Sequence, residues 1–387
     1  MEIRPVVFAS ESEIGRNRLL FLDRHAADSG TVSKNEAYRS TCRLFHCGLI
    51  DRTATLNLGF HVDIVDPLEN VLRHAPVSGD FAQICGARAE SIVDEAIARD
   101  RQIQLLWSGG IDSTVAFIAM HKAATTRNCQ SRIQVLCSSD SVAEYRSFFF
   151  EHIWNKYEVQ AVGFPVSSYL NADSLIVTGE HGDQLFGSDF LKPYVTNGLA
   201  FEAWQKVLPF VFAAHEVRDA EAKMVVDYLS PLMAACPVDI VTLFDFFWWL
   251  NFATKWQAVT LRIPANSDNP AAVFKATRHF FRDRDFERWS LFSHHRKRLE
   301  AWSEYKLPAK QFIFDFTGDN EYFNSKEKEQ SLRLVFAGEP EWRKEEKRKR
   351  EANDPKKTDR SQPEFPTGVG RVLTSDFTTA FVQPVLS

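Results

Sequence analysis

Two short segments that contain glycines hold most of the residues in this chain that could do chemistry. The first is Ser108–Ser113 (SGGIDS), which lies between a short apolar run and a stretch with helical spacing. Two adjacent glycines let the backbone turn tightly and approach a ligand closely. The free amides at the start of the following helix, reinforced by the helix dipole, attract anions. The segment therefore predicts a loop that binds phosphate groups.

The side chains of this loop indicate which phosphates it binds. The hydroxyls of Ser108, Ser113 and Thr114 can donate hydrogen bonds to phosphate oxygens. A carboxylate such as Asp112 is unexpected in a site that binds anions alone. A bound Mg²⁺ would account for it, because this ion prefers oxygen ligands and often takes one or two carboxylates. The segment lacks the ending of the Walker loop and the third glycine of the dinucleotide fingerprint. The alternative is a plain strand-to-helix turn in which Asp112 caps the helix.

The second segment, Gly179–Asp183 (GEHGD), places two carboxylates three positions apart between glycines. Asp183 could complete a Mg²⁺ site begun by Asp112. Glu180 could take a proton from an amine or orient a substrate. The alternative is a polar turn at the start of a helix near Asp183.

Strands that alternate with helices must position these two segments. Apolar runs predict strands at Gln102–Trp107, Arg132–Cys137 and Leu175–Thr178, and helical spacing occurs at Thr114–Ala124 and Val142–Tyr157. This alternation predicts an α/β fold with a parallel, doubly wound sheet. Ligands bind such sheets at the carboxyl ends of the strands, which is where the polar segments lie.

The remaining sequence predicts a small mixed N-terminal unit and a mainly helical C-terminal part. Thr53–Ile64 alternates apolar and polar residues as a strand does, and the aromatic segment Val241–Phe252 is typical of a helical core. We expect three parts: an α+β unit over 1–95, the unit with both polar segments over 96–338, and a charged, partly flexible segment over 339–387.

Composition and charge exclude several classes of function. A net charge of −5 over 387 residues is not the basic footprint of a nucleic-acid binder, so no clear nucleic-acid site is expected. Six cysteines follow no common zinc or disulfide spacing. The longest apolar run, Phe244–Leu250, is far shorter than a membrane span, and the N-terminal residues lack a signal pattern. We expect a cytoplasmic protein with no membrane partner.

Both polar segments match known signatures. Ser108–Ser113 resembles the SGGxDS signature of the N-type ATP pyrophosphatases (PP-loop superfamily), in which the loop binds the pyrophosphate part of ATP. Thr178–Gly187 (TGEHGDQLFG) is similar to the SGEGxDExFGG stretch in the synthetase domain of asparagine synthetases, which β-lactam synthetases share. The resemblance covers residues 105–190 well and 200–300 loosely. It implies an adenine nucleotide alpha hydrolase-like sheet.

The resemblance also implies a role for each matching position. Asp112 and Asp183 match the Mg²⁺ ligands, and Glu180 matches the catalytic glutamate. The late lysine of the family, which stabilises the pyrophosphate, is expected at Lys326 or Lys328, with Lys310 as a further candidate. The expected ATP-binding positions, which include the strand end that holds adenine, are Ser108, Gly109, Gly110, Asp112, Ser113, Thr114, Leu136, Cys137 and Gly179.

Three departures from the family pattern affect the expected substrate. Gln184 stands where the family has Glu, and only Arg262 and Pro264 remain of its R-x-PFLD segment. The chain begins Met1-Glu2, whereas glutamine-hydrolysing members need a cysteine after the initiator Met. We therefore expect no glutaminase activity, so the nitrogen would come from ammonia or another amine.

The expected activity is that of a glutamine-independent, ATP-dependent carbon–nitrogen ligase. With ATP and Mg²⁺, it would activate a carboxylate of a small molecule or peptide as an acyl-adenylate and release pyrophosphate. An amine or ammonia would then form an amide and release AMP. Two alternatives remain open: a non-catalytic nucleotide-binding or assembly protein that retains the fold, and a PP-loop enzyme that modifies a nucleobase. The assembly also remains open, with a homodimer as one option.

Overall fold

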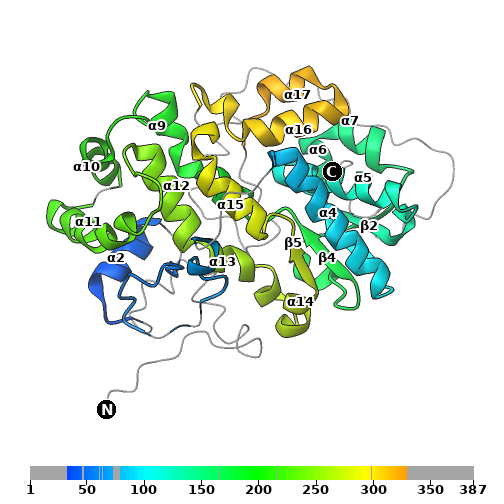
Figure 1. The fold of residues 1–387 in the computed structure, drawn as a ribbon, viewed down its shortest axis with the longest axis horizontal. Coiled ribbons are helices and arrows are strands. Elements are labelled where there is room, and N and C mark those ends of the chain that lie inside the picture. Colours follow the sequence, from blue (N-terminus) through cyan, green and yellow to red (C-terminus); the bar gives the residue numbers. More distant parts are fainter. Residues whose placement is uncertain are drawn as a thin grey trace, which may run out of the picture.

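A parallel sheet in the order β3-β2-β1-β4-β5 lies at the centre of the computed structural model (Figure 1). The structure describes residues 33–328 apart from 46, 47, 61, 63, 73–78, 164, 216 and 298, so the segment 339–387 lies outside the described residues. The strands are β1 (Ile103–Leu106), β2 (Ile133–Cys137), β3 (Glu158–Ala161), β4 (Leu175–Thr178) and β5 (Thr277–His279).

Helices cover both faces of this sheet. Those before β4 and directly after it are α2 (Glu36–Phe45), α3 (Glu69–Leu72), α4 (Phe81–Ala98), α5 (Ile111–Thr126), α6 (Ser139–Glu144), α7 (Arg146–Phe148), α8 (Gly182–Phe186) and α9 (Lys192–Thr196). The later ones are α10 (Trp204–Ala214), α11 (Asp219–Ala234), α12 (Leu243–Thr254), α13 (Trp256–Leu261), α14 (Pro270–Ala276), α15 (Arg284–Phe292), α16 (Leu307–Thr317) and α17 (Asn320–Ser325). Single turns lie at Gln130–Arg132, Phe149–Ile153, Val166–Tyr169, Asp189–Leu191, Pro264–Asn266, His294–Lys297 and Trp302–Glu304.

Alternate residues of each strand pack on opposite faces. Leu105 and Val177 belong to the large core that includes α4 and α5, whereas Ile176 packs with Val273 of α14 on the other face. Strands buried on both faces are apolar throughout, which explains why the runs that contain β1, β2 and β4 were predictable. The expected α/β class with a parallel sheet is confirmed.

Two strands and one helix differ from the sequence expectation. The sequence did not predict β3 and β5, which have only four and three residues and are partly polar. The expected helix over Val142–Tyr157 is wrong as a single element: it divides into α6, α7 and a π-helical turn before β3. Short edge strands carry too little apolar periodicity to be recognised.

The predicted strand at Thr53–Ile64 is also wrong, because its described residues form turns and extended segments without strand pairing. The Asp51 carboxylate accepts hydrogen bonds from the amides of Thr53 (2.8 Å) and Thr55 (2.7 Å). These bonds fold the chain around a single side chain and take backbone donors that a sheet would need. The described part of residues 33–98 therefore contains helices and no strand.

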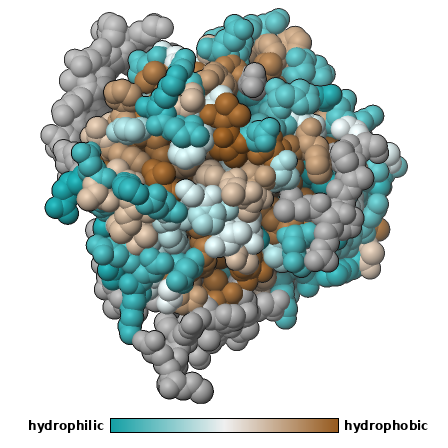
Figure 2. All heavy atoms as spheres, turned by 60° about the vertical axis from the view of Figure 1, so that its left-hand side comes forward, coloured by the Kyte–Doolittle hydropathy of each residue, from teal (hydrophilic) through white to brown (hydrophobic). Residues whose placement is uncertain are grey.

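The aromatic segment is buried as predicted. It forms α12, every residue of which is buried, and Thr242 caps its start by accepting a hydrogen bond from the Asp245 amide (3.2 Å). None of the described helices is long and apolar enough to cross a membrane. Turned so that the left-hand side of Figure 1 comes forward, the molecule shows apolar areas separated by polar side chains (Figure 2).

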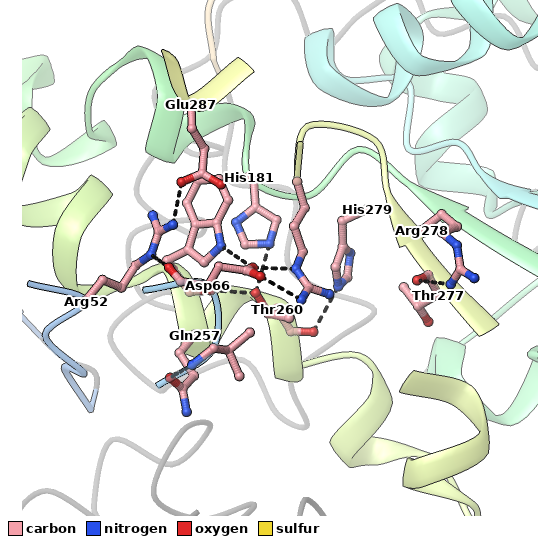
Figure 3. A network of polar contacts seen from close by, with 12 residues as sticks. Arg52, Asp66, His181, Gln257, Thr260, Thr277, Arg278, His279 and Glu287 are labelled. Carbon is pink, nitrogen blue, oxygen red and sulfur yellow. Dashed lines mark hydrogen bonds and ion pairs between the residues drawn. The ribbon is translucent and has the colours of Figure 1, made fainter. Parts of the chain in front are cut away.

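A buried ion pair joins the N-terminal region to the rest of the fold. The Arg52 guanidinium lies over the Trp256 ring and binds the Glu287 carboxylate at 2.5 Å, with both side chains almost fully buried (Figure 3). Burial raises the pKa of Glu287, although Arg52 opposes this. Removal of either charged side chain would therefore leave the other buried without a partner.

We expect Glu287→Gln to lower the free energy of unfolding by about 3–5 kcal/mol, because it leaves the Arg52 charge buried without a partner. Urea denaturation measures this loss. Asp227→Asn is the matched control, since it breaks an exposed Lys223–Asp227 pair (2.6 Å) and should leave stability nearly unchanged. Equal effects of both substitutions would contradict this expectation.

Candidate active site

The Ser108–Ser113 loop connects β1 to α5 as a tight turn closed by its own hydroxyls. The Ser108 amide donates to the Ser113 hydroxyl (3.0 Å), and the two hydroxyls lie 2.9 Å apart. Gly109 has a φ of 77°, and a Cβ there would lie 2.3 Å from the Ser141 carbonyl oxygen. Only glycine fits this position, so Gly109 determines the turn that precedes α5.

The first turn of α5 keeps its amides available. Gly110 is the N-terminal cap and makes no side-chain cap hydrogen bond. Asp112, at the second helical position, forms an ion pair with Lys306 instead of capping the helix. The alternative of Asp112 as a helix cap is therefore wrong. Uncapped amides at a helix start form a site suited to an anion.

The two polar segments touch each other. A Cβ on Gly182 would lie 2.2 Å from an Asp112 carboxylate oxygen, and one on Gly179 would lie 2.7 Å from the Ser113 amide nitrogen. Both contacts arise because β1 and β4 are neighbours in the sheet. The strand order reverses between these two strands, the point at which open α/β sheets bind ligands.

Two lysines from the end of the described chain reach this junction. The buried Lys306 ammonium pairs with Asp112 and, at 2.8 Å, with Asp183. Lys328 binds the other oxygen of Asp183 at 2.5 Å, and the Tyr305 hydroxyl lies 3.4 Å from that carboxylate. The junction thus holds two carboxylates and two ammonium groups.

The other two lysine candidates do not pair with Asp112 or Asp183, although the Glu144 carboxylate that holds Lys326 lies against the loop, 3.2 Å from the position of a Cβ on Gly110. Lys326 pairs with Glu144 at 3.1 Å. Lys310 is buried and donates to the carbonyl oxygens of Ser303 (2.7 Å) and Lys326 (3.0 Å). Of the three candidates named from the sequence, the structure brings only Lys328 to the carboxylates.

Sequence reasoning missed Lys306, although one signal marked its position. Lys306 precedes Leu307-Pro308 at the start of α16, and proline in the first turn marks a helix start. The backbone of Lys306 is left-handed, with a φ of 63°. A lysine charge is also unfavourable at a helix start. Its two carboxylate partners, distant in sequence, compensate for these costs.

Glu180 is partly buried and forms an ion pair with Arg262, so this proposed remnant of the family pattern does lie at the site. Burial raises the pKa of Glu180, and Arg262 partly offsets the rise. Pro264 lies in the turn after Arg262. A carboxylate whose pKa is shifted toward neutrality is better matched to proton transfer at physiological pH.

Burial and charge act in opposite directions on the other two carboxylates. Burial raises the pKa of Asp112 even though Lys306 opposes the rise. Burial also disfavours ionised Asp183, but Lys306 and Lys328 outweigh it and hold its pKa below the usual range. Asp183 therefore stays ionised at all physiological pH values.

The donor set fits a Mg²⁺ ion that shares its ligands with phosphate. No group of three or more His, Cys, Asp or Glu side chains in the described residues could hold a metal by itself. Asp112 and Asp183 share one ammonium, and one buried oxygen of Asp112 has no hydrogen-bond partner. Mg²⁺ commonly uses one or two carboxylates with substrate phosphates and water, so these residues fit it.

Three expected nucleotide-binding residues already make one hydrogen bond each within the protein. The Thr114 hydroxyl accepts a hydrogen bond from the Trp107 indole (3.2 Å). The Leu136 and Cys137 side chains are buried, and their carbonyl oxygens accept from the amides of Trp107 (2.9 Å) and Val162 (3.0 Å). The hydroxyl keeps its own hydrogen to donate and each carbonyl oxygen keeps a second lone pair, so these bonds do not exclude contact with a ligand.

Gln184 points away from the two carboxylates. Its buried amide donates to Asn251 of α12 at 3.1 Å. The neighbouring His181 has a left-handed backbone, packs on Trp256, and has a pKa held well below its usual value by burial. The uncharged amide of Gln184 suits this interior position better than the glutamate of the family that this segment resembles.

No family model matches the chain, and no curated protein matches its sequence.

Gly182→Ala should disturb this site more than the fold. The new Cβ would take the place of an Asp112 carboxylate oxygen, so that carboxylate must move. We expect Mg·ATP affinity to fall about tenfold or more, the effect of losing one interaction with a charged group. Calorimetry measures the affinity. Gly86→Ala is the control, because a Cβ there meets nothing within 4 Å. Unchanged affinity in Gly182→Ala would contradict the expectation.

Proposed function

We propose that this chain is an ATP-dependent carbon–nitrogen ligase that activates a carboxylate as an acyl-adenylate. The observation that carries the proposal is the contact between the Ser108–Ser113 loop and the Gly179–Asp183 segment, with Lys306 between Asp112 and Asp183. One strand junction brings together a phosphate-type loop, two carboxylates and two lysines. Cleavage of ATP to pyrophosphate requires groups of these kinds.

We propose in addition that the sheet is of the adenine nucleotide alpha hydrolase-like type. The parallel order β3-β2-β1-β4-β5 supports this, as does the location of the loop directly after β1. The amides at the start of α5 would hold the β- and γ-phosphates of ATP. Asp112 and Asp183 would hold Mg²⁺, which supplies charge neutralisation for those phosphates when bound.

In the first step, a carboxylate oxygen of the substrate attacks the α-phosphorus of ATP, and pyrophosphate leaves. Negative charge grows on the leaving oxygens as the bond breaks. Lys306 and Lys328 lie against the carboxylates of the site, from which their ammonium groups can turn toward these oxygens. Buried, preorganised cations at the position where charge develops stabilise the transition state.

In the second step, an amine or ammonia attacks the acyl carbon, the amide forms and AMP leaves. The attacking nitrogen must lose a proton, and Glu180 is the carboxylate suited to accept it, since burial raises its pKa. Arg262 holds the Glu180 side chain in place through their ion pair. The proposal thus gives nucleotide binding and proton transfer to different carboxylates.

Incubation with ATP, Mg²⁺ and a panel of carboxylic acids and amines tests the proposal. It predicts AMP and pyrophosphate in equal amounts, with an acid that is required for both. Release of ADP and phosphate in place of these products would contradict it. So would pyrophosphate formation that persists unchanged in Asp183→Asn.

A further inference from the structure

A cavity of about 520 Å³ outside the candidate active site is rich in arginine. None of its lining residues belongs to the Ser108–Ser113 loop or to the Gly179–Asp183 segment. Its volume is within the range of small-ligand sites. The arginines come from α4, from β5 and the turn after it, and from α15: Arg88, Arg278, Arg282, Arg284 and Arg288.

Part of this lining is held in a fixed orientation. Arg282 binds Asp66, which is labelled in Figure 3, through two hydrogen bonds of 2.6 and 3.0 Å. Arg278 binds Glu95 in the same two-pronged way, at 2.9 and 2.6 Å. Guanidinium groups fixed in this manner lose little further entropy when they bind a ligand.

Other arginines of the cavity lack a close carboxylate. The nearest ion-pair partner of Arg88 is Asp283 at 3.6 Å, and its shorter bonds go to the carbonyl oxygens of Phe280 (3.2 Å) and His279 (3.3 Å). Arg284 is exposed and makes no hydrogen bond or ion pair with any other residue in the described part of the chain. The guanidinium groups of Arg88 and Arg284 therefore have N–H donors available for a ligand.

The balance of charge in the lining is positive. Five arginines face the carboxylates of Asp66, Asp283, Asp285 and Glu287. Outside the lining, Arg52 neutralises Glu287 and Glu95 neutralises Arg278, so five arginines against four carboxylates leave the lining with one net positive charge. Burial lowers the pKa of Arg88, as do the neighbouring Arg278 and Arg282, while Asp283 opposes this. A bound anion would relieve the repulsion among these cations.

We propose that this arginine cavity is a second anion-binding site, for a small ligand that carries a phosphate group or two carboxylates. Arginine forks bind both groups through paired hydrogen bonds. The proposal does not depend on the function proposed above, because it uses none of the residues assigned to ATP. One wall is connected to the active-site strand: His279 lines the cavity and lies 2.7 Å from the Thr178 hydroxyl at the end of β4.

Anion binding to the full chain tests this proposal. Inorganic phosphate and succinate are titrated separately by calorimetry, against chloride at equal ionic strength. We expect at least one of the two to bind, and the one that binds identifies the ligand group. Arg284→Gln should weaken that binding about tenfold, the effect of one charge-assisted hydrogen bond, and should not disturb the fold because Arg284 is exposed. Arg88→Gln should weaken it at least as much.

Two further variants make the result decisive. Arg43→Gln is the matched control: Arg43 of α2 pairs with Glu221 at 2.9 Å but does not line the cavity, so binding should not change. Lys328→Gln reports binding at the other site. The proposal is overturned if neither anion binds, if Arg43→Gln weakens binding as much as Arg284→Gln, or if Lys328→Gln weakens binding and Arg284→Gln does not.

Discussion

Lys306→Met is expected to reduce pyrophosphate formation by about 10²–10³-fold, the loss that follows removal of one electrostatic stabiliser. The Lys306 ammonium is the only group in the described residues that pairs with both Asp112 and Asp183. Without it, two buried carboxylates face each other with Lys328 as the remaining cation. The charge that stabilises departing pyrophosphate is lost as well. Single-turnover release of pyrophosphate measures the effect.

A second variant separates catalysis from folding. Lys306→Met alone should also lower the free energy of unfolding by about 1–3 kcal/mol, since it leaves the Asp112 carboxylate without its cation. Asp112→Asn combined with Lys306→Met removes one charge of each sign and should regain much of that stability. Because Asp112 is itself a proposed Mg²⁺ ligand, the double variant is compared with Asp112→Asn alone, and it should form pyrophosphate more slowly still. If the double variant is as active as Asp112→Asn alone, the role of Lys306 is structural only.

Asp183→Asn and Glu180→Gln are expected to block different steps. Asp183 lies against both lysines, so its loss should reduce pyrophosphate formation itself, by about 10²–10³-fold. Glu180 pairs with Arg262 and should serve the later transfer to the amine. Glu180→Gln keeps the shape of the side chain but cannot accept a proton, a loss that typically costs about 10²–10⁴-fold.

Single-turnover assays with labelled ATP distinguish the two variants. Glu180→Gln should release pyrophosphate and accumulate an adenylate that hydrolyses slowly without forming amide. Asp183→Asn should leave most of the ATP intact. If both variants behave like the parent protein, the Gly179–Asp183 segment is a polar turn without a catalytic role.

The positions of both polar segments were accessible from sequence because each depends on local features. Glycines, a preceding apolar strand and a following helix predicted the Ser108–Ser113 loop and its place after β1. That Asp183 lies close enough to Asp112 to share a site was only an expectation, since it depends on which strands are neighbours in the sheet. That order depends on packing throughout the chain, which a single sequence does not encode in any local pattern.

The lysines show where prediction from sequence fails. Lys306 is distant in sequence from Asp112 and Asp183, and nothing in its neighbourhood except the Pro308 helix start distinguishes it from other lysines. Lys326 and Lys328 are two positions apart, yet one pairs with Glu144 and the other with Asp183. The direction of a side chain at the end of a helix is set by tertiary contacts. Asp51 shows the same limit for Thr53–Ile64, where one carboxylate overrides strand periodicity.

Binding of an ATP analogue that cannot be cleaved between its α- and β-phosphates tests the central claim most directly, because it needs no knowledge of the acid or the amine. We predict that Mg²⁺ with α,β-methylene-ATP binds the folded protein at one site in calorimetry. Asp112→Asn should weaken that binding about tenfold or more, and Arg43→Gln should not change it. A folded sample that takes up no analogue at millimolar concentration would contradict the account.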